Sequence, residues 1–189
     1  MSAKKPPHRN FSFRFAEHAD IPLIGEMAQK TWRKCYAEII SPGQMTYMLE
    51  RMYGAPVIAE EIEDGVIWEL ALKDNMPVGF YSCTFDQGLQ NLKLNKLYVL
   101  PEAQGQGCGK TMLARVRNLG AGLGARKIWL QVNKKNVAAI RTYERAGYHI
   151  EREDVFDIGS GFVMDDYIMA MAIPEWSAVS SKDAAPVGT

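Results

Sequence analysis

Apolar and polar residues follow a period of two at first and then a period near 3.6. Over residues 11–15 phenylalanine stands at every second position, which predicts a first strand that ends near Ala16. From Ile24 to Tyr36 apolar residues recur every three or four positions, behind the helix-starting residues Asp20 and Pro22. This part of the chain therefore predicts a strand followed by an amphipathic helix.

Two more helices are predicted before residue 66. Ser41 and Pro42 are typical of a helix start, and the apolar residues behind them are spaced by three and four: Met45, Met48, Leu49 and Met52. This methionine stripe favours core packing, with a pliable wall of an acceptor groove as the alternative. The third helix is predicted from Pro56 to Asp64. Its acidic residues favour a solvated face or, alternatively, the steering of a cationic amine.

The remaining pattern predicts strands and helices in alternation. Three strands come first, as an antiparallel meander over Val66–Lys73, Val78–Phe85 and Asn91–Val99. The later elements are a helix over Gly107–Leu119, a strand over Ile128–Val132, a helix over Asn136–Ala146, and strands over Tyr148–Asp157 and Phe162–Ile173. The connection through the first of these helices is long enough for a crossover between parallel strands. We therefore expect an α/β (α+β) fold, with a mixed and largely antiparallel central sheet flanked by helices.

Composition fits one domain. The chain has 189 residues, of which 47% are hydrophobic, so it is long enough for one buried core and short for two. We expect a single domain over residues 11–176, a flexible N-terminus over 1–10 and a disordered tail over 177–189. Lys and Arg total 22, as do Asp and Glu. Without a global positive field, nucleic acid is not an expected partner.

The three cysteines, Cys35, Cys83 and Cys108, form neither an even set nor a C-x-x-C pair. The sequence therefore indicates no disulfide framework and no metal site, and we expect a reducing, cytoplasmic location. No apolar segment follows the basic N-terminus, and no apolar run approaches 18 residues. Neither export nor a membrane partner is expected.

The most specific chemical signal is the segment from Gln104 to Thr111, which has glycine at positions 105, 107 and 109. An apolar run ends before it at Val99, and an amphipathic run begins at Thr111. Such a loop lets backbone N–H groups approach an anion, and the helix dipole adds about half a positive charge. The segment therefore predicts a phosphate-bearing ligand, with an ordinary tight turn as the alternative.

Two familiar phosphate-binding motifs miss this segment by one position. The nucleoside-triphosphate loop G-x-x-x-x-G-K-[ST] requires glycine where Gln104 stands. The dinucleotide fingerprint G-x-G-x-x-G requires glycine where Lys110 or Met112 stands, depending on where it starts. A nucleoside triphosphatase therefore remains only as a lesser hypothesis.

The pattern that matches is Gln/Arg-x-x-Gly-x-Gly/Ala, at Gln104, Gly107 and Gly109, and it resembles the coenzyme A loop of the GNAT N-acetyltransferases. Downstream, residues 136–148 resemble the family's segment N-x-x-A-x-x-x-Y-x-x-x-G-[FY]. The order of the predicted elements also resembles the GNAT fold over about residues 11 to 173. The resemblance implies an acyltransferase with acetyl-coenzyme A as cosubstrate.

The resemblance also implies where the cosubstrate binds. In the family the pantetheine arm lies between the fourth and fifth strands, and here the backbone of Leu97 and Val99 would bond it. The N–H of Leu97 or Tyr98 would face the thioester oxygen. The Lys110 ammonium and the Thr111 hydroxyl would be added donors to the pyrophosphate. The pyrophosphate would lie on the backbone N–H groups of one loop, which comprises Gln104, Gly105, Gln106, Gly107, Cys108, Gly109, Lys110 and Thr111.

By the same resemblance, Tyr143 is the general acid that hydrogen-bonds the coenzyme A sulfur; a helix-packing aromatic is the alternative. Its phenol, with an ordinary pKa near 10, suits donation at neutral pH. Asn136 is expected to cap the helix and to contact the cofactor arm. A helix start can lower the pKa of a thiol, but no base is evident beside Cys108, so a spacer role is expected.

The proton acceptor is left open by the sequence. Many family members carry a glutamate on the fourth strand, whereas Lys93, Asn95 and Lys96 occupy its polar positions here. We expect Asn95 to order a water that relays the proton. The alternatives are bulk water, Tyr36, Asp86 and Asp165.

We expect residues 31–64 and the hairpin over 159–166 to form the acceptor pocket. These segments carry aromatic and acidic residues: Trp32, Tyr36, Tyr47, Tyr53, Glu60, Asp165 and Asp166. This composition favours a polyamine, an amino sugar or a peptide N-terminus, with a slight preference for a small polyamine. Ordinary surface polarity is the alternative. A non-catalytic acyl-coenzyme A sensor is the alternative function, and the resemblance also admits a homodimer.

Overall fold

The computed structural model describes residues 11–174, so the predicted flexible ends lie largely outside the described residues. The helices and strands are β1 (Phe11–Phe15), α1 (Ile21–Cys35), α2 (Pro42–Tyr53), α3 (Ala55–Glu63), β2 (Ile67–Lys73), β3 (Met76–Asp86), β4 (Asn91–Val99), α4 (Cys108–Gly122), β5 (Lys127–Asn133), α5 (Val137–Arg145), β6 (His149–Gly159) and β7 (Phe162–Ala172). Every predicted element is present, with ends that differ by a few residues. No described helix is both long and apolar enough to cross a membrane.

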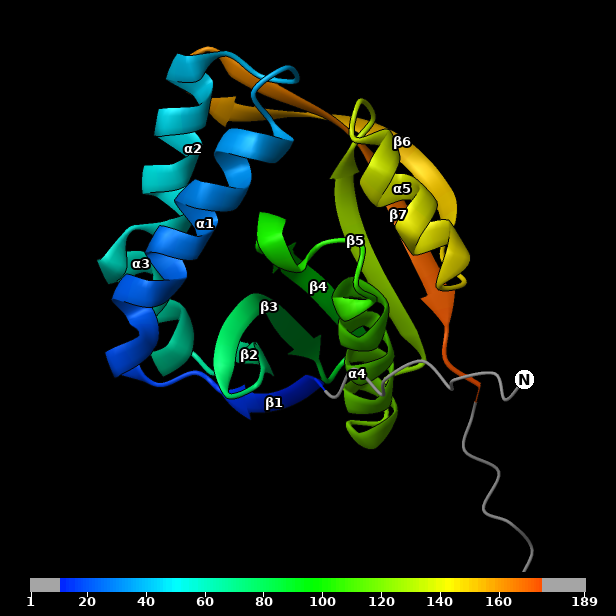
Figure 1. Ribbon diagram of the computed structural model, residues 1–189. Helices are drawn as coiled ribbons and strands as arrows, with labels where there is room; N and C mark the ends of the chain where they lie inside the picture. Colours follow the sequence, from blue (N-terminus) through cyan, green and yellow to red (C-terminus); the bar gives the residue numbers. More distant parts are fainter. Residues whose placement is uncertain (1–10, 175–189) are drawn as a thin grey trace, which may run out of the picture.

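Seven strands form one sheet in the order β1-β2-β3-β4-β5-β7-β6. Each neighbouring pair is antiparallel except β4 and β5, which are parallel because α4 crosses over between them (Figure 1). The prediction of a mixed and largely antiparallel sheet is confirmed.

Helices cover both faces of the sheet (Figure 1). On one face α4 and α5 bury a core against the sheet that includes Met112, Val116 and Ile128. On the other face α1, α2 and α3 bury a more aromatic core that includes Trp32, Trp68 and Phe80. These two layers of side chains thus cover the central strands on both faces.

The strand β4 changes its register at Asn95. On β3, Ser82 pairs with Lys96 and Cys83 pairs with Leu94, so Asn95 is the extra residue of a β-bulge. Leu94 and Leu97, three positions apart, therefore lie on the same α4-facing side of the sheet. Sequence periodicity alone would place them on opposite faces.

Beyond this bulge β4 and β5 separate. They pair only over Asn91–Leu94 and Lys127–Leu130, although β4 continues to Val99 and β5 to Asn133. One backbone edge of the second half of β4 therefore has no strand partner. The predicted gap between the fourth and fifth strands is present.

Two boundaries differ from the prediction for local reasons. Asp74 and Asn75 both have positive φ values, 51° and 62°, as a two-residue hairpin turn requires, so β3 begins directly at Met76 and not after Pro77. The helix α4 runs past its predicted end at Leu119 and includes Gly120. This glycine does not end the helix but allows close packing. A Cβ there would lie 2.9 Å from Ile173 Cδ1.

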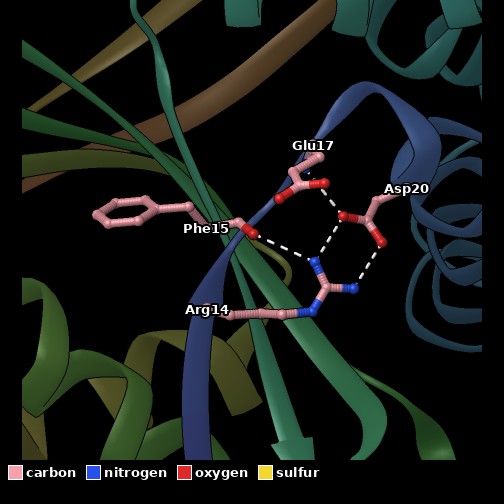
Figure 2. A network of polar contacts seen from close by, with 4 residues as sticks. All are labelled: Arg14, Phe15, Glu17 and Asp20. Atoms are coloured by element: carbon pink, nitrogen blue, oxygen red, sulfur yellow. Dashed lines mark hydrogen bonds and ion pairs between the residues drawn. The ribbon is translucent and has the colours of Figure 1, made fainter.

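Asp20 joins β1 to α1 (Figure 2). The Arg14 guanidinium donates to both carboxylate oxygens of Asp20, at 2.7 and 2.6 Å, and the Glu17 N–H donates to one of them at 2.9 Å. Asp20 stands at the N-cap position as predicted, but its side chain accepts no bond from the helix. The hydrogen bond from Arg14 lowers the pKa of Asp20. Asp20 thus connects the start of α1 to Arg14 of β1.

Candidate active site

A cavity of about 550 Å³ opens where β4 and β5 separate, and we refer to it as the donor cavity. Its walls come from β4, β5, α5 and the loop before α4. Most of the predicted cofactor residues line it: Leu97, Tyr98, Val99, Gln104, Gly105, Gly107, Cys108, Gly109, Lys110, Asn136 and Tyr143. The fold therefore brings together two sequence motifs that are a helix and a strand apart.

The loop ahead of α4 presents the start of the helix to this cavity. Gly105 and Gly107 have φ values of 71° and 89°, which side chains other than glycine adopt with strain. Gly107 is the N-cap, so no side chain covers the first N–H groups of α4. Gly109 differs, because its φ is not positive and a Cβ there would meet only Val99 Cγ2, at 3.9 Å. Its missing side chain leaves room in the cavity and is not required by the fold.

The exposed backbone edge of β4 can be assigned from one hydrogen bond. Gln104 Nε2 donates to the carbonyl oxygen of Val99 at 3.0 Å, so this carbonyl points away from β3. Because backbone groups two residues apart in a strand point the same way, the N–H and C=O of Leu97 share this edge. Those of Tyr98 face β3. Of the two predicted carbonyl polarisers, Leu97 is therefore the one on the cavity side.

Two predicted cofactor residues do not line the donor cavity with their side chains. Gln106 accepts from Lys73 Nζ at 2.7 Å and donates to the Glu102 carbonyl at 2.8 Å. The Thr111 hydroxyl donates to the Gly107 carbonyl at 3.1 Å, within the first turn of α4. The side chains of both residues are thus engaged within the protein.

Cys108 is buried beside Met112, with 3.7 Å between the two sulfur atoms. Burial raises the pKa of its thiol to about 11, whereas a helix start alone would lower it. The residue contributes an uncharged apolar wall, which supports the predicted spacer role.

The helix α5 carries the second motif. Asn136 Oδ1 accepts from the Ala139 N–H at 3.2 Å, so the predicted cap is present. Tyr143 lines the donor cavity and packs edge-on against Tyr148, with 5.8 Å between the ring centroids. Burial raises the pKa of Tyr143, with the nearby Tyr36 hydroxyl adding to the effect. Tyr143 is thus a neutral hydrogen-bond donor over the whole physiological range.

A second cavity, of about 420 Å³, lies on the side of the sheet covered by α1–α3, and we refer to it as the acceptor cavity. It shares six lining residues with the donor cavity: Tyr36, Leu94, Asn95, Lys96, Tyr98 and Gln131. The two cavities therefore meet at the gap between β4 and β5. Asn95, whose amide donates to Thr84 Oγ1 at 2.8 Å, faces both.

The hairpin of β6 and β7 reaches α2 (Figure 1), and residues of both elements line the acceptor cavity. The Tyr47 hydroxyl donates to the Ile158 carbonyl at 2.7 Å, and Gln44 Nε2 donates to the Val163 carbonyl at 3.0 Å. Met48 and Met52 of α2 line the cavity. Met48 is also buried in the core, so the methionine stripe serves both of the roles considered for it.

One buried carboxylate faces the acceptor cavity without a full set of partners. Asp166 is 5% exposed, and its Oδ1 atom has no hydrogen-bond partner among the described residues. Burial raises its pKa to about 6, and the neighbouring Asp165 charge adds to the rise. A buried oxygen of this kind is costly unless a ligand satisfies it.

A model of the acetyltransferase (GNAT) family matches residues 26–148, about two thirds of the chain. The chain belongs to the GNAT family. The predicted family, fold and enzyme class, an acyltransferase, are thereby confirmed.

Several GNAT proteins resemble the chain over most of its length. An uncharacterised N-acetyltransferase of Mycobacterium tuberculosis is 25% identical over 150 residues, which cover 79% of this chain and 96% of that protein. The spermidine N(1)-acetyltransferase of Thermoplasma acidophilum is 24% identical over 151 residues, which cover 77% of this chain and 90% of the relative. The crystal structure of the PaiA N-acetyltransferase of T. acidophilum, in complex with coenzyme A, has a TM-score of 0.75 at 21% identity and covers 86% of this chain and 99% of that one.

In this GNAT protein the candidates for the proton acceptor separate clearly. Asp86 accepts from the Leu89 N–H in a turn, and Asp165 pairs with Lys134 at 2.5 Å; neither lines a cavity. Tyr36 lines both cavities, but burial raises its pKa. Asp166, which the sequence indicated only as part of the acceptor pocket, lines the acceptor cavity with an oxygen that has no hydrogen-bond partner among the described residues, and its pKa is raised to about 6. The sequence held one indication of this, because Asp165 and Asp166 are neighbours on one strand and only one of the two side chains can point inward.

Within the described residues, no group of His, Cys, Asp or Glu could hold a metal ion. The donor cavity offers instead a helix start, backbone groups of β4 and the exposed Lys110, which are donors for a phosphate-bearing ligand.

Replacing Gly109 by leucine should separate ligand binding from folding. Leucine favours a helix by about 0.5–1 kcal/mol over glycine, so the thermal midpoint should stay equal or rise. The side chain would project into the donor cavity, so coenzyme A should bind at least about tenfold more weakly, measured by calorimetric titration. A Gly122→Leu variant at the other end of α4, where a Cβ meets nothing within 4 Å, is the control. Equal affinities in both variants would show that the start of α4 is not the cofactor site.

Proposed function

We propose that the protein transfers an acetyl group from acetyl-coenzyme A to a primary amine by direct attack, with both substrates bound at once. The observation that carries this proposal is the meeting of two cavities at the gap between β4 and β5. One cavity has the donors for a pyrophosphate and a pantetheine arm. The other has a buried carboxylate, Asp166, and does not include the start of α4. The coenzyme A complex of the similar PaiA protein supports the identity of the donor.

The reaction needs a neutral amine and a stabilised leaving group. The amine nitrogen attacks the thioester carbonyl carbon, and the oxygen, as it gains charge, faces the Leu97 N–H. The C–N bond forms, Asp166 accepts a proton from the nitrogen, and the C–S bond then breaks to release the coenzyme A thiolate. Holding the amine beside the thioester supplies a large part of the rate enhancement.

Asp166 acts during the attack and not before it. A lysine-like amine with a pKa of about 10.4 is neutral in only about one molecule in two thousand at pH 7, a cost of about 4.6 kcal/mol. A carboxylate with a pKa of about 6 does not remove that proton at equilibrium. The nitrogen becomes far more acidic once it bonds to carbon, and a carboxylate then suffices. A water held by Asn95 stays the predicted route for the remaining proton.

Tyr143 contributes a hydrogen bond to the sulfur. A thiol has an ordinary pKa of about 8.5, well below the raised pKa of the buried Tyr143. The departing thiolate is therefore too weak a base to take the phenol proton fully. We propose hydrogen-bond donation from Tyr143 in place of the complete proton transfer that the sequence suggested.

The proposal is tested by incubating the protein with acetyl-coenzyme A and each amine of a panel. The panel contains spermidine, an aminoglycoside, a short peptide and linear amines with and without a carboxylate. We expect thiol release coupled to formation of the acetylated amine, detected by mass spectrometry. If coenzyme A binds and no amine supports thiol release, the proposal fails and the sensor hypothesis replaces it. Tighter binding of ATP than of coenzyme A would instead favour the triphosphatase.

A further inference from the structure

The acceptor cavity is not acidic. Five charged side chains line it: Arg51, Glu61, Lys93, Lys96 and Asp166. Three are cations and two are carboxylates. Glu60 and Asp165, which the sequence suggested for a polycationic acceptor, do not line it. The basis for a polyamine preference is therefore absent from the cavity wall.

Glu61 and Lys96 neutralise each other. Lys96 Nζ donates to both carboxylate oxygens of Glu61, at 2.6 and 2.8 Å, and lies 4.7 Å from the Trp68 ring centroid. The Lys96 side chain is 4% exposed. A buried, satisfied ion pair of this kind forms part of the wall and offers little charge to a ligand.

Arg51 is committed to the hairpin. Its guanidinium donates to the Tyr47 hydroxyl at 2.6 Å and to the Ile158 carbonyl. Like Lys93 and Asp166, Arg51 has no ion-pair partner within the described residues, but its hydrogen bonds hold its guanidinium on the hairpin. Lys93 and Asp166 are then the two lining charges left for a ligand, and they have opposite signs.

Lys93 is a half-buried cation aimed over β5. Its ammonium lies 4.8 Å from the Trp129 ring centroid, and no carboxylate of residues 11–174 pairs with it. Burial lowers its pKa. A desolvated cation of this kind binds an anion strongly when one is supplied.

One ligand can touch both groups. Lys93 pairs with Trp129, and Asp166 pairs with Asn133, four positions farther along β5. These positions are about 13 Å apart along the strand, and the side chains of Lys93 and Asp166 line the same cavity. A linear molecule of several bonds fits between the ammonium and the carboxylate.

We propose that the acceptor is an amine that also carries a carboxylate several bonds from the reacting nitrogen, and that Lys93 selects it. This inference rests on the proposed function of the same site. The amine would lie at Asp166 and the carboxylate at Lys93. A diamine or polyamine would place a second ammonium against Lys93, which disfavours it by like-charge repulsion.

Three amines of similar length test the inference: 6-aminohexanoate, hexylamine and 1,6-diaminohexane. We expect kcat/KM to fall in that order, with about a tenfold step between the first two. Lys93→Met keeps the apolar stem over Trp129 and should abolish the advantage of the carboxylate. Lys93→Glu should reverse the order, in favour of the diamine. Lys127→Met removes a β5 lysine that pairs with Glu151 outside the cavity, at 3.0 Å, and should change nothing.

The possible results distinguish a failure of this inference from a failure of the proposed function. If the wild type prefers the diamine, or if Lys93→Met and Lys93→Glu fold and keep the wild-type order, the inference is wrong while the proposed function stands. If no amine is acetylated although coenzyme A binds, the proposed function fails first and this inference fails with it. Thermal melting of each variant shows whether it is folded.

Discussion

Tyr143→Phe should lower kcat about 10²-fold while coenzyme A binds with nearly unchanged affinity. The phenol hydroxyl would stabilise the sulfur only as negative charge develops on it, so its loss affects the transition state more than the bound ground state. The ring itself, which packs against Tyr148 and the wall of the donor cavity, is kept. The effect should appear in kcat, measured by thiol release at saturating acetyl-coenzyme A.

Tyr148→Phe is the matched control. Its hydroxyl is buried without a hydrogen-bond partner, and it does not line the donor cavity. Removal of an unsatisfied hydroxyl should leave kcat unchanged and stability equal or higher. Equal losses in the two variants would show that Tyr143 acts through packing and not through its hydroxyl.

Asp166→Asn should lower activity and raise stability at the same time. The pKa of Asp166 is about 6 in the folded protein and about 3.9 in an unfolded chain. Because the folded state binds this proton more tightly, the stability gained from the protonated group is complete below about pH 4 and is lost as the pH rises through about 6. Above that range the buried carboxylate costs about 3 kcal/mol, and asparagine removes this cost.

Activity should respond in the opposite direction. If Asp166 must be ionised to accept the proton, kcat/KM of the wild type rises with pH through about 6. In Asp166→Asn this acid limb should disappear, and the rate at pH 8 should be about 10²-fold lower. Asp165→Asn, the exposed neighbour that pairs with Lys134, should keep the limb. An unchanged acid limb in Asp166→Asn would assign the proton acceptor to another group.

The donor half of the site could be predicted from the sequence because it depends on backbone. Gly105 and Gly107 reveal their positive φ values through their residue type, and Asn136 and Tyr143 occur at fixed spacing on one helix. The change from an antiparallel to a mixed sheet could also be predicted, since the helix-length connection between β4 and β5 permits a parallel pair. Short motifs suffice where a cavity wall is built from main-chain groups.

The acceptor half could not be predicted, because it depends on which side chains share a cavity. The β-bulge at Asn95 reverses the faces of the residues after it, and no local signal marked it. Pairing of Glu61 with Lys96 removes two charges from the count. Asp165 and Asp166 differ only in the face of β7 on which they lie. Counting acidic residues along the chain therefore suggested a polycation, whereas in the folded cavity Lys93 and Asp166 are the two charges that neither an ion pair nor the hairpin holds.

In the proposed mechanism, donor and acceptor are held at once across the gap between β4 and β5. Initial rates with acetyl-coenzyme A and the best amine of the panel, each varied at fixed levels of the other, test it most directly. The structure predicts intersecting double-reciprocal lines and no acetylated protein when the amine is omitted. Parallel lines, together with an acetyl group on the protein at Cys108 or elsewhere, would contradict it.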